Sequence, residues 1–356
     1  MTIKIGWVVA VSALLSAAAG ARGGAMMAAP DETPLLFDRL RAFPAVVVAT
    51  TAAGFEKNPA PVRGTNCVQL PVKIEAVLKG DLKSGPFRLD VHEQLPALMA
   101  QRDANSAHRY LLVMGVEKGK GYLGGGMVYK DLERFYLTDA GLEKAAKVFI
   151  EANDVSAAAM FKLADGLLAD KDVSASASAC GHVYAVLARL AAKSDEDEWR
   201  AMDKALLKQT ISRAGAAVRE GNCAGPAAAV LVAMAGRTGN VELDSNLAGP
   251  ARKWLSAEAN AAAPAWRPDY MAADAMTPVI DLLGRLKDRE ARDLLVKIAK
   301  DNRWGGLRRA VMAALEQILT PEEMKELNLP QPRSIPGKLP RPIMRGGPEP
   351  FVPTDN

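Results

Sequence analysis

The chain has 356 residues, a formal net charge of +4 and 24% charged side chains, with both signs of charge mixed along its segments. A nucleic-acid-binding protein would concentrate lysine and arginine on one face, so the composition points neither to nucleic acid nor to an anionic membrane. A chain of this length is expected to form two domains with enough residues to bury a core.

The first 21 residues have the layout of a secretory signal peptide. Lys4 precedes an apolar run at residues 5–19, and Ala19-Gly20-Ala21 places small residues before the expected cleavage site. The run has about 15 residues, whereas a transmembrane helix needs roughly 20. We therefore expect residues 1–21 to be removed and the protein to be exported to the periplasm or the cell exterior, with no transmembrane segment after cleavage.

Residues 31–140 have the period of strands. Short apolar or alternating runs are separated by clusters of Gly, Pro, Asn and Lys, and they fall at residues 45–50, 72–75, 87–91, 111–114 and 127–137. Lys79-Gly80-Asp81 has the composition of a turn between two of them. About five strands in some 100 residues predict a small antiparallel β-barrel, because closure removes exposed sheet edges.

Three of these segments resemble bacterial netrin-like domains. They are Val-Lys-Ile-Glu-Ala-Val-Leu-Lys-Gly-Asp at residues 72–81, Phe-Arg-Leu-Asp-Val at 87–91 and Arg-Tyr-Leu-Leu-Val at 109–113. The resemblance spans roughly residues 43–140 and implies the OB-type barrel that these domains share with tissue inhibitors of metalloproteinases. Inhibition in that family depends on a cysteine at the mature N-terminus, and the first cysteine here is Cys67. The resemblance therefore assigns no inhibitory residue to this sequence.

After Thr138 the apolar period changes to that of helices. Stripes at helical spacing lie within residues 142–149, 160–168 and 183–190. Ser194, followed by acidic residues at 195–198, has the composition of a helix N-terminus, and Gly221 that of a helix end. We therefore expect residues 195–220 to form one long helix or two nearly collinear ones.

Shorter stripes recur at residues 279–286, 291–298 and 307–315. Leu-Gly-Arg-Leu-Lys-Asp at 283–288 and Leu-Arg-Arg-Ala-Val at 307–311 resemble HEAT-like repeats in their small contact residues and in the arginine that opens the second helix. Helices this short are marginal alone and become stable by stacking on neighbours. The expected fold class is thus α+β and multidomain, with the barrel followed at residues 141–326 by a HEAT-like α-solenoid or an irregular helical bundle.

The last segment, residues 327–356, is rich in proline and poor in apolar side chains. It cannot bury enough surface to offset the entropy cost of ordering, which predicts a disordered tail. A polyproline recognition segment around residues 339–342 is the alternative.

Several motifs suggest chemistry but lack the setting that the chemistry needs. Residues 119–124 spell Gly-Lys-Gly-Tyr-Leu-Gly, but a dinucleotide site needs a helix next and a strand-like run follows, so we interpret them as a hairpin loop. His92-Glu93 and His108 lack the zinc-protease spacing. The chain has no Gly-x-Ser-x-Gly elbow, and Cys180 and His182 would lie on different faces of a helix. We predict no catalytic residue, metal site or cofactor.

Three cysteines, Cys67, Cys180 and Cys223, leave two interpretations open. An exported protein can form a disulfide between Cys180 and Cys223, which leaves Cys67 unpaired. Alternatively, all three are buried thiols.

The sequence favours an exported, non-enzymatic binding or scaffold protein whose partner is a protein or another component of the bacterial cell envelope. Stacks of paired helices typically bind through an extended surface, and a small barrel can bind across one face. One alternative is an envelope enzyme with a site around Cys67, His92 and His108. A secreted protease inhibitor is the other.

Overall fold

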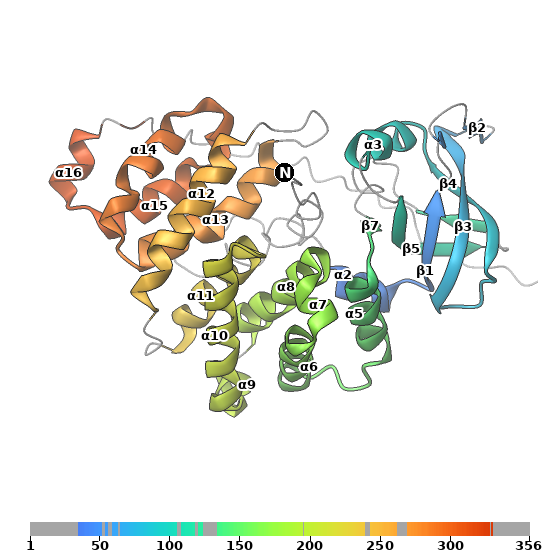
Figure 1. The fold of residues 1–356 in the computed structure, drawn as a ribbon, viewed down its shortest axis with the longest axis horizontal. Helices are drawn as coiled ribbons and strands as arrows, with labels where there is room; N and C mark the ends of the chain where they lie inside the picture. The colour runs from blue at the N-terminus through green and yellow to red at the C-terminus, as the bar shows by residue number, and fades with distance from the viewer. Residues whose placement is uncertain are drawn as a thin grey trace, which may run out of the picture.

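The computed structural model of the chain describes residues 35–327 and 329, apart from residues 52–53, 56–58, 63–64, 105–107, 118–119, 124–133, 195, 239–242 and 262–268. The predicted signal peptide at 1–21, residues 330–356 of the predicted tail and the first part of the strand predicted at 127–137 lie outside these residues. The described part is a small β-barrel followed by a mostly helical region, which confirms the predicted fold class (Figure 1).

The barrel contains five strands that close on themselves. The strands of the sheet are β1 (Ala45–Thr51), β2 (Ala60–Pro61), β3 (Cys67–Lys79), β4 (Gly85–His92), β5 (Arg109–Glu117), β6 (Lys120–Tyr122) and β7 (Phe135–Leu137). The ring runs β1-β3-β4-β6-β5 and closes because β5 also pairs with β1, while β2 adds to β3 and β7 adds to β5. Helix α3 (Leu95–Arg102) connects β4 to β5.

One pair of strands in the ring is parallel. Leu89 and Asp90 of β4 are in register with Gly121 and Tyr122 of β6, and these two strands run in the same direction. A closed ring with an odd number of strands cannot alternate direction all the way round. The predicted antiparallel barrel therefore contains one parallel pair by topological necessity.

Strand β1 is buried on both faces, which explains its continuous apolar run. Val47 belongs to the core inside the barrel, whereas Val46 and Val48 belong to the core that the barrel shares with the helices. Gly80 follows the end of β3 with a φ of +94°, and a Cβ there would lie 2.7 Å from the carbonyl oxygen of Pro44. The predicted turn at this glycine thus allows β3 to pass close to the start of β1.

The helical region begins directly after β7. Its α-helices are α5 (Ala140–Glu151), α6 (Ala157–Ala169), α7 (Lys171–Ala175), α8 (Ala177–Lys193), α9 (Glu196–Ala201), α10 (Lys204–Glu220), α11 (Ala224–Thr238), α12 (Ala248–Asn260), α13 (Asp269–Arg285), α14 (Arg292–Lys300), α15 (Arg308–Ile318) and α16 (Pro321–Glu326). Short 3-10 helices η3 (Ser245–Leu247), η4 (Arg289–Ala291) and η5 (Asn302–Leu307) precede α12, α14 and α15.

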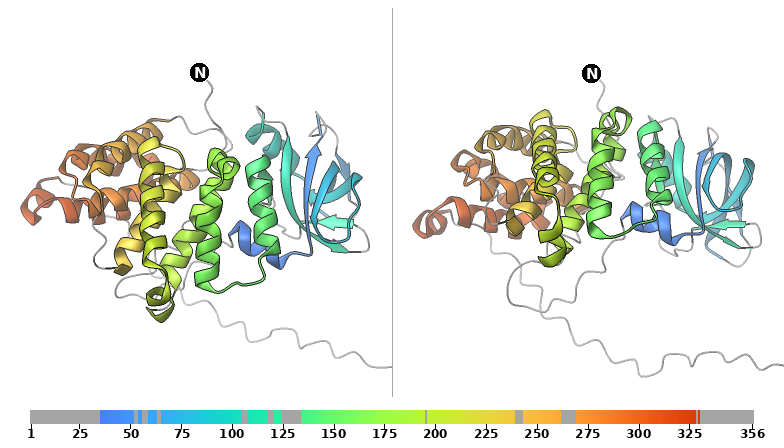
Figure 2. Two further views of the ribbon diagram at one scale, coloured as in Figure 1. Left: turned by 60° about the horizontal axis from the view of Figure 1, so that its bottom comes forward. Right: turned by 90° about the horizontal axis from the view of Figure 1, so that it is seen from below.

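The helices form two rows. In the inner row α8 packs on α11, α11 on α13, and α13 on α15. In the outer row α10 contacts α6 and α12, and α12 contacts α14. Each outer helix also packs on the inner helix that follows it, as α10 does on α11 and α12 on α13, so the unit is a pair of helices (Figures 1 and 2).

The helix boundaries in the middle of the chain differ in part from expectation. Gly221 ends α10 in the left-handed conformation with φ of +70°, as predicted. The segment 195–220, predicted as one long helix or two nearly collinear ones, contains two helices, because Asp203 caps α10 by accepting a hydrogen bond from the amide of Ala205. Ser194 was predicted as an N-cap, but α9 begins at Glu196, and the Ser194 hydroxyl donates to the carbonyl of Leu190 at 2.7 Å.

Helix α2 (Leu36–Ala42) precedes the barrel in sequence but packs on α5 and α8. The ring centroids of Phe37 and Phe149 are 4.5 Å apart, and Arg189 of α8 forms an ion pair with Asp38. The ammonium of Lys79 at the end of β3 donates to the carbonyls of Leu40 and Arg41 at 3.1 and 2.6 Å, where the helix dipole favours a cation. Helix α2 therefore ties the barrel to the helical stack.

Within the described residues, no helix combines the length and the apolar character that crossing a bilayer requires.

Candidate functional site

Two of the three residues of the predicted enzyme site are neighbours in the barrel. Cys67 begins β3 directly opposite His92 of β4 in the antiparallel register, and both side chains are partly exposed. Side chains opposite one another in such a pair have Cβ atoms roughly 4.5–5.5 Å apart. His92 accepts a hydrogen bond at Nδ1 from the amide of Gln94 at 3.3 Å.

His108 has a different set of neighbours. It precedes β5 in the left-handed conformation, with φ of 49°, which is strained for a residue other than glycine. Its ring packs edge-on against Phe55 with centroids 5.7 Å apart, and its Nδ1 lies 3.3 Å from the hydroxyl of Tyr110. Among the residues that the structure describes, no three His, Cys, Asp or Glu side chains form a group that could hold a metal ion.

Tyr110 belongs to a buried polar network at one end of the barrel. Its hydroxyl donates to Asp103 at 2.8 Å, and Arg102 donates to both carboxylate oxygens of Asp103 at 2.6 and 2.7 Å. Burial, followed by the negative charge of Asp103, raises the pKa of the Tyr110 phenol, so it stays protonated and donates. The network fixes the end of α3 against β5, and its chemistry is that of a buried ion pair with a phenol donor.

Residues 119–124 were predicted as a hairpin loop, but Lys120–Tyr122 form strand β6 of a hairpin with β5. Lys120 and Gly121 pair with Glu117 and Val116 of β5 in antiparallel register. A Cβ on Gly121 would lie 2.6 Å from the ring of Phe87 and 2.8 Å from the sulfur of Met114. This glycine therefore serves close packing inside the barrel.

The cysteines of the predicted disulfide, Cys180 and Cys223, lie side by side. Both are buried free thiols, Cys180 on α8 and Cys223 just before α11, and the Cys223 thiol donates to the carbonyl of Ala177 at 3.3 Å. Hydrogen bonding with Cys180 and then burial raise the pKa of the Cys223 thiol well above its usual value. The fold thus brings this pair together and leaves Cys67 apart, on the barrel.

A buried histidine lies where the barrel meets the stack. His182 of α8 is 4% exposed, and its ring packs edge-on against Tyr136 of β7 with centroids 5.3 Å apart. Neither of its ring nitrogens has a hydrogen-bond partner among the described residues. Burial and then the positive charge of Arg39 lower the pKa of His182 to about 3. His182 is therefore a neutral packing residue at neutral pH, and it faces away from Cys180 as expected for positions two apart on a helix.

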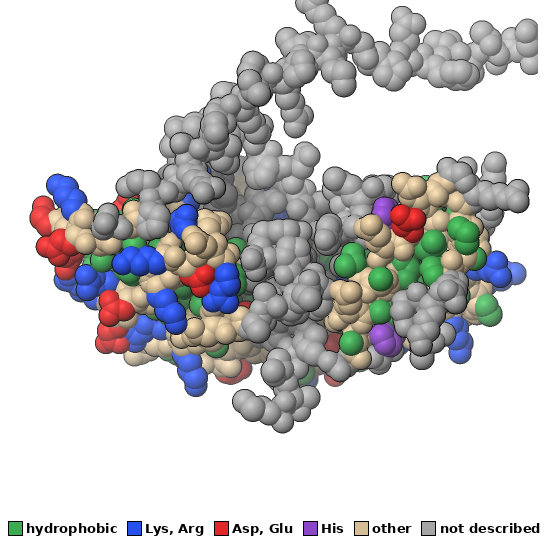
Figure 3. All heavy atoms as spheres, turned by 90° about the horizontal axis from the view of Figure 1, so that it is seen from above, with side chains coloured by type: hydrophobic (Ala, Val, Ile, Leu, Met, Phe, Trp, Pro, Cys, Tyr) green, Lys and Arg blue, Asp and Glu red, His purple; other side chains and the backbone are tan. Residues whose placement is uncertain are grey.

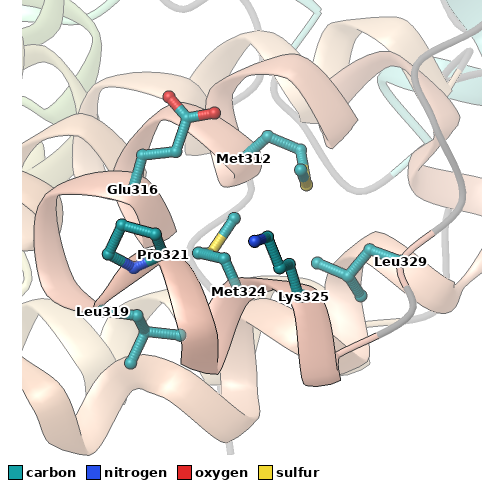
Figure 4. A pocket seen from close by; sticks show the side chains of 7 residues that line it. All are labelled: Met312, Glu316, Leu319, Pro321, Met324, Lys325 and Leu329. Carbon is teal, nitrogen blue, oxygen red and sulfur yellow. The ribbon is translucent and has the colours of Figure 1, made fainter.

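An open groove lies at the far end of the stack. It has a volume of about 710 Å³, within the range of ligand pockets. Figure 4 shows Met312 and Glu316 of α15 on one wall and Met324, Lys325 and Leu329 of the α16 segment on the other. Leu319 and Pro321 also line the groove. The lining is mostly apolar, with one side chain of each charge.

The position of the groove follows from the two rows of helices. Helix α13 packs between α11 and α15, whereas α15 is the last inner helix among the described residues. The next inner helix would lie against the side of α15 that carries Met312 and Glu316. The groove, which we call the end groove, is thus the place where a further inner helix would pack, and no described helix occupies it. The apolar stripe predicted at 307–315 indicated α15, but it could not show that α15 is the last inner helix among the described residues.

These features define a closed barrel joined to a two-row helical stack with an open apolar end. Comparisons of the chain with protein-family models, with curated proteins and with solved structures give no match.

Proposed function

We propose that this protein is an exported, non-enzymatic binding or scaffold protein of the bacterial cell envelope, and that it holds a segment of a protein partner in the end groove. The observation that carries the proposal is the groove itself, where half-buried Met312 and Met324 face each other. Methionine side chains are flexible and polarizable and suit a surface that adapts to a partner.

The netrin-like and HEAT-like resemblances are part of this proposal. The ring of five strands, with α3 between β4 and β5, supports the netrin-like domain. Ion pairs that recur between neighbouring helices of the stack support a repeat: Lys144 of α5 pairs with Asp170 before α7 at 2.5 Å, Arg219 of α10 with Asp244 before η3 at 3.1 Å, and Arg252 of α12 with Asp288 before η4 at 3.1 Å. A cation on one helix thus meets the carboxylate that caps the next.

Site-specific photocrosslinking in intact cells tests the proposal. A photoreactive phenylalanine replaces Met312 in the end groove or, as control, Lys253 on the exposed side of α12. We expect a discrete adduct with another protein from position 312 in the envelope fraction and none from position 253. Met324→Glu, which places a charge in the opposite wall, should abolish that adduct. The same adduct from both positions, or an adduct that survives Met324→Glu, would contradict the proposal.

Cell fractionation and intact-mass measurement test the export part. We expect a mature protein that lacks residues 1–21 and is recovered outside the cytoplasm. Recovery of the full-length chain in the cytoplasm would contradict it.

A further inference from the structure

We propose that, in the absence of a partner, the chain's own C-terminal segment, residues 330–345, occupies the end groove and must be displaced for a partner to bind. The inference rests on the proposed function, because it concerns the regulation of the same site. Three observations support the inference: the segment begins next to the groove, its charge is opposite to that of the nearby carboxylates, and its composition excludes a further inner helix.

The last described residue before the segment lies at the groove. Leu329 lines the groove, and the next residue is Pro330. A segment tethered at the edge of its site has an effective concentration in the millimolar range, so even weak contacts suffice to hold it. Ten extended residues span roughly 30 Å at 3.1 Å each, whereas six helical residues such as those of α16 rise only about 9 Å. The segment is therefore long enough to run along the whole groove.

The end of the stack and the segment carry opposite charges. Glu316 and Lys325 line the groove, and α16 adds the exposed side chains of Glu322 and Glu326, so acidic groups outnumber basic ones there by three to one. Figure 3 shows acidic side chains, with basic ones between them, at the left-hand edge of the molecule. Residues 330–345 contain four basic residues and no acidic one; the basic residues are Arg333, Lys338, Arg341 and Arg345. Long-range attraction thus favours this segment over a neutral one.

The composition of the segment selects an extended occupant. Residues 330–356 contain 8 of the chain's 22 prolines, and proline has no amide hydrogen and breaks a helix interior. The segment cannot supply the next inner helix. Proline instead favours the polyproline II conformation, which leaves apolar side chains such as Ile335 and Leu339 free to contact Met312 and Met324.

Photocrosslinking of the purified full-length protein tests the inference. With the photoreactive residue at position 312, we expect an adduct within one chain whose peptides map to residues 330–345. Reversing the four tail charges (R333E, K338E, R341E and R345E) should lower its yield at least fivefold. Reversing two exposed lysines of α10, K204E and K208E, should leave the yield unchanged.

Three outcomes would overturn the inference: an adduct to another part of the chain, an adduct of dimer size that joins two copies, or an unchanged yield in the tail-charge variant. The photocrosslinking experiment in intact cells distinguishes failure of the tail-docking inference from failure of the proposed function. If the tail does not dock, the partner adduct from position 312 has the same yield with native and reversed tail charges. If the tail docks and the proposed function holds, the reversed variant gives at least threefold more partner adduct. A docked tail with no partner adduct in either variant would contradict the proposed function alone.

Discussion

The guanidinium of Arg39 donates a hydrogen bond of 2.9 Å to the hydroxyl of Tyr136, and both side chains are buried. Arg39 lies on α2 and Tyr136 on β7, so the bond joins the helix before the barrel to the last strand of the sheet. The ring of His182 packs against Tyr136 from the side of the stack. Barrel and stack therefore meet at a histidine that has a cation nearby and no hydrogen-bond partner for its ring among the described residues.

This arrangement predicts loss of stability in acid. The pKa of His182 is lowered to about 3 by burial and by Arg39, against 6.5 for an ordinary histidine. The unfolded chain takes up a proton as the pH falls below 6.5, and the folded chain does not until about pH 3. The free energy of unfolding should thus fall between these values, by about 2 kcal/mol from pH 7.5 to pH 5 for this group. Urea unfolding at several pH values measures it.

A variant without the imidazole isolates the contribution of His182. His182→Leu cannot take up a proton and should flatten the pH dependence, although its stability at pH 7.5 also changes through packing. His92→Gln, which removes a partly exposed imidazole from the barrel, is the matched control, and His182→Leu should change the slope more than this control does. Equal slopes in the native protein and in His182→Leu would refute this assignment.

The network of Arg102, Asp103 and Tyr110 predicts two unequal losses. Asp103→Asn leaves the guanidinium of Arg102 buried without its carboxylate, which should cost about 3–5 kcal/mol. Tyr110→Phe removes the hydrogen bond to Asp103 and the contact with Nδ1 of His108 but leaves the ion pair, which should cost about 1–3 kcal/mol. Urea midpoints measure both, and exposed Glu93→Gln serves as control. A larger loss for Tyr110→Phe than for Asp103→Asn would show that the ion pair is not the main support.

The parts of the fold that depend on local pattern could be predicted from the sequence. The stripe of Leu142, Ala145, Ala146 and Phe149 becomes the buried face of α5, because helical spacing alone decides which side chains share a face. The continuous apolar run at 45–50 becomes a strand buried on both faces for a similar reason.

Features that depend on long-range contacts could not be predicted. Helix α2 has only seven residues, and its place is set by Phe149, Arg189 and Tyr136, which lie far along the chain. The same holds for the candidate site. The end groove is open because α15 is the last inner helix among the described residues, and no local pattern at Met312 or Met324 encodes where a row ends.

Two glycines in helices predict stability changes of opposite sign. A Cβ on Gly284 of α13 would lie 2.9 Å from the Cα of Ala314 on α15, so Gly284→Ala should push two inner helices apart and cost about 1–3 kcal/mol. Gly166 of α6 is exposed and has open space around it, so Gly166→Ala should stabilise by about 0.5–1 kcal/mol through helix propensity. Thermal unfolding compares them. Stabilisation by both would show that α13 and α15 tolerate a wider separation.

The three cysteines predict an order of reactivity with a thiol reagent. Cys67 is partly exposed, whereas Cys180 and Cys223 are 4% and 1% exposed. Only a thiolate reacts readily, and the pKa of Cys223 is raised. In chain produced in a reducing cytoplasm we therefore expect one label per folded molecule, at Cys67, and three after unfolding. Labelling of Cys180 or Cys223 as fast as Cys67 would contradict the packing of α8 on α11.

The same pair predicts a difference between compartments. Because the folded chain buries both thiols and raises the pKa of Cys223, a bridge between Cys180 and Cys223 should form while the chain folds in an oxidising compartment, when both sulfurs are still accessible to a disulfide-donating oxidant. Protein matured through export should then be 2 Da lighter than the reduced chain, and after unfolding it should take up one label instead of three.

Closing a loop of this length stabilises by about 4 kcal/mol in the chain-entropy picture, so reduction should lower the urea midpoint of the exported form. Cys67→Ala should leave that shift intact, whereas Cys180→Ala should remove it. An exported protein that still takes up three labels would show that the pair serves only as buried thiols.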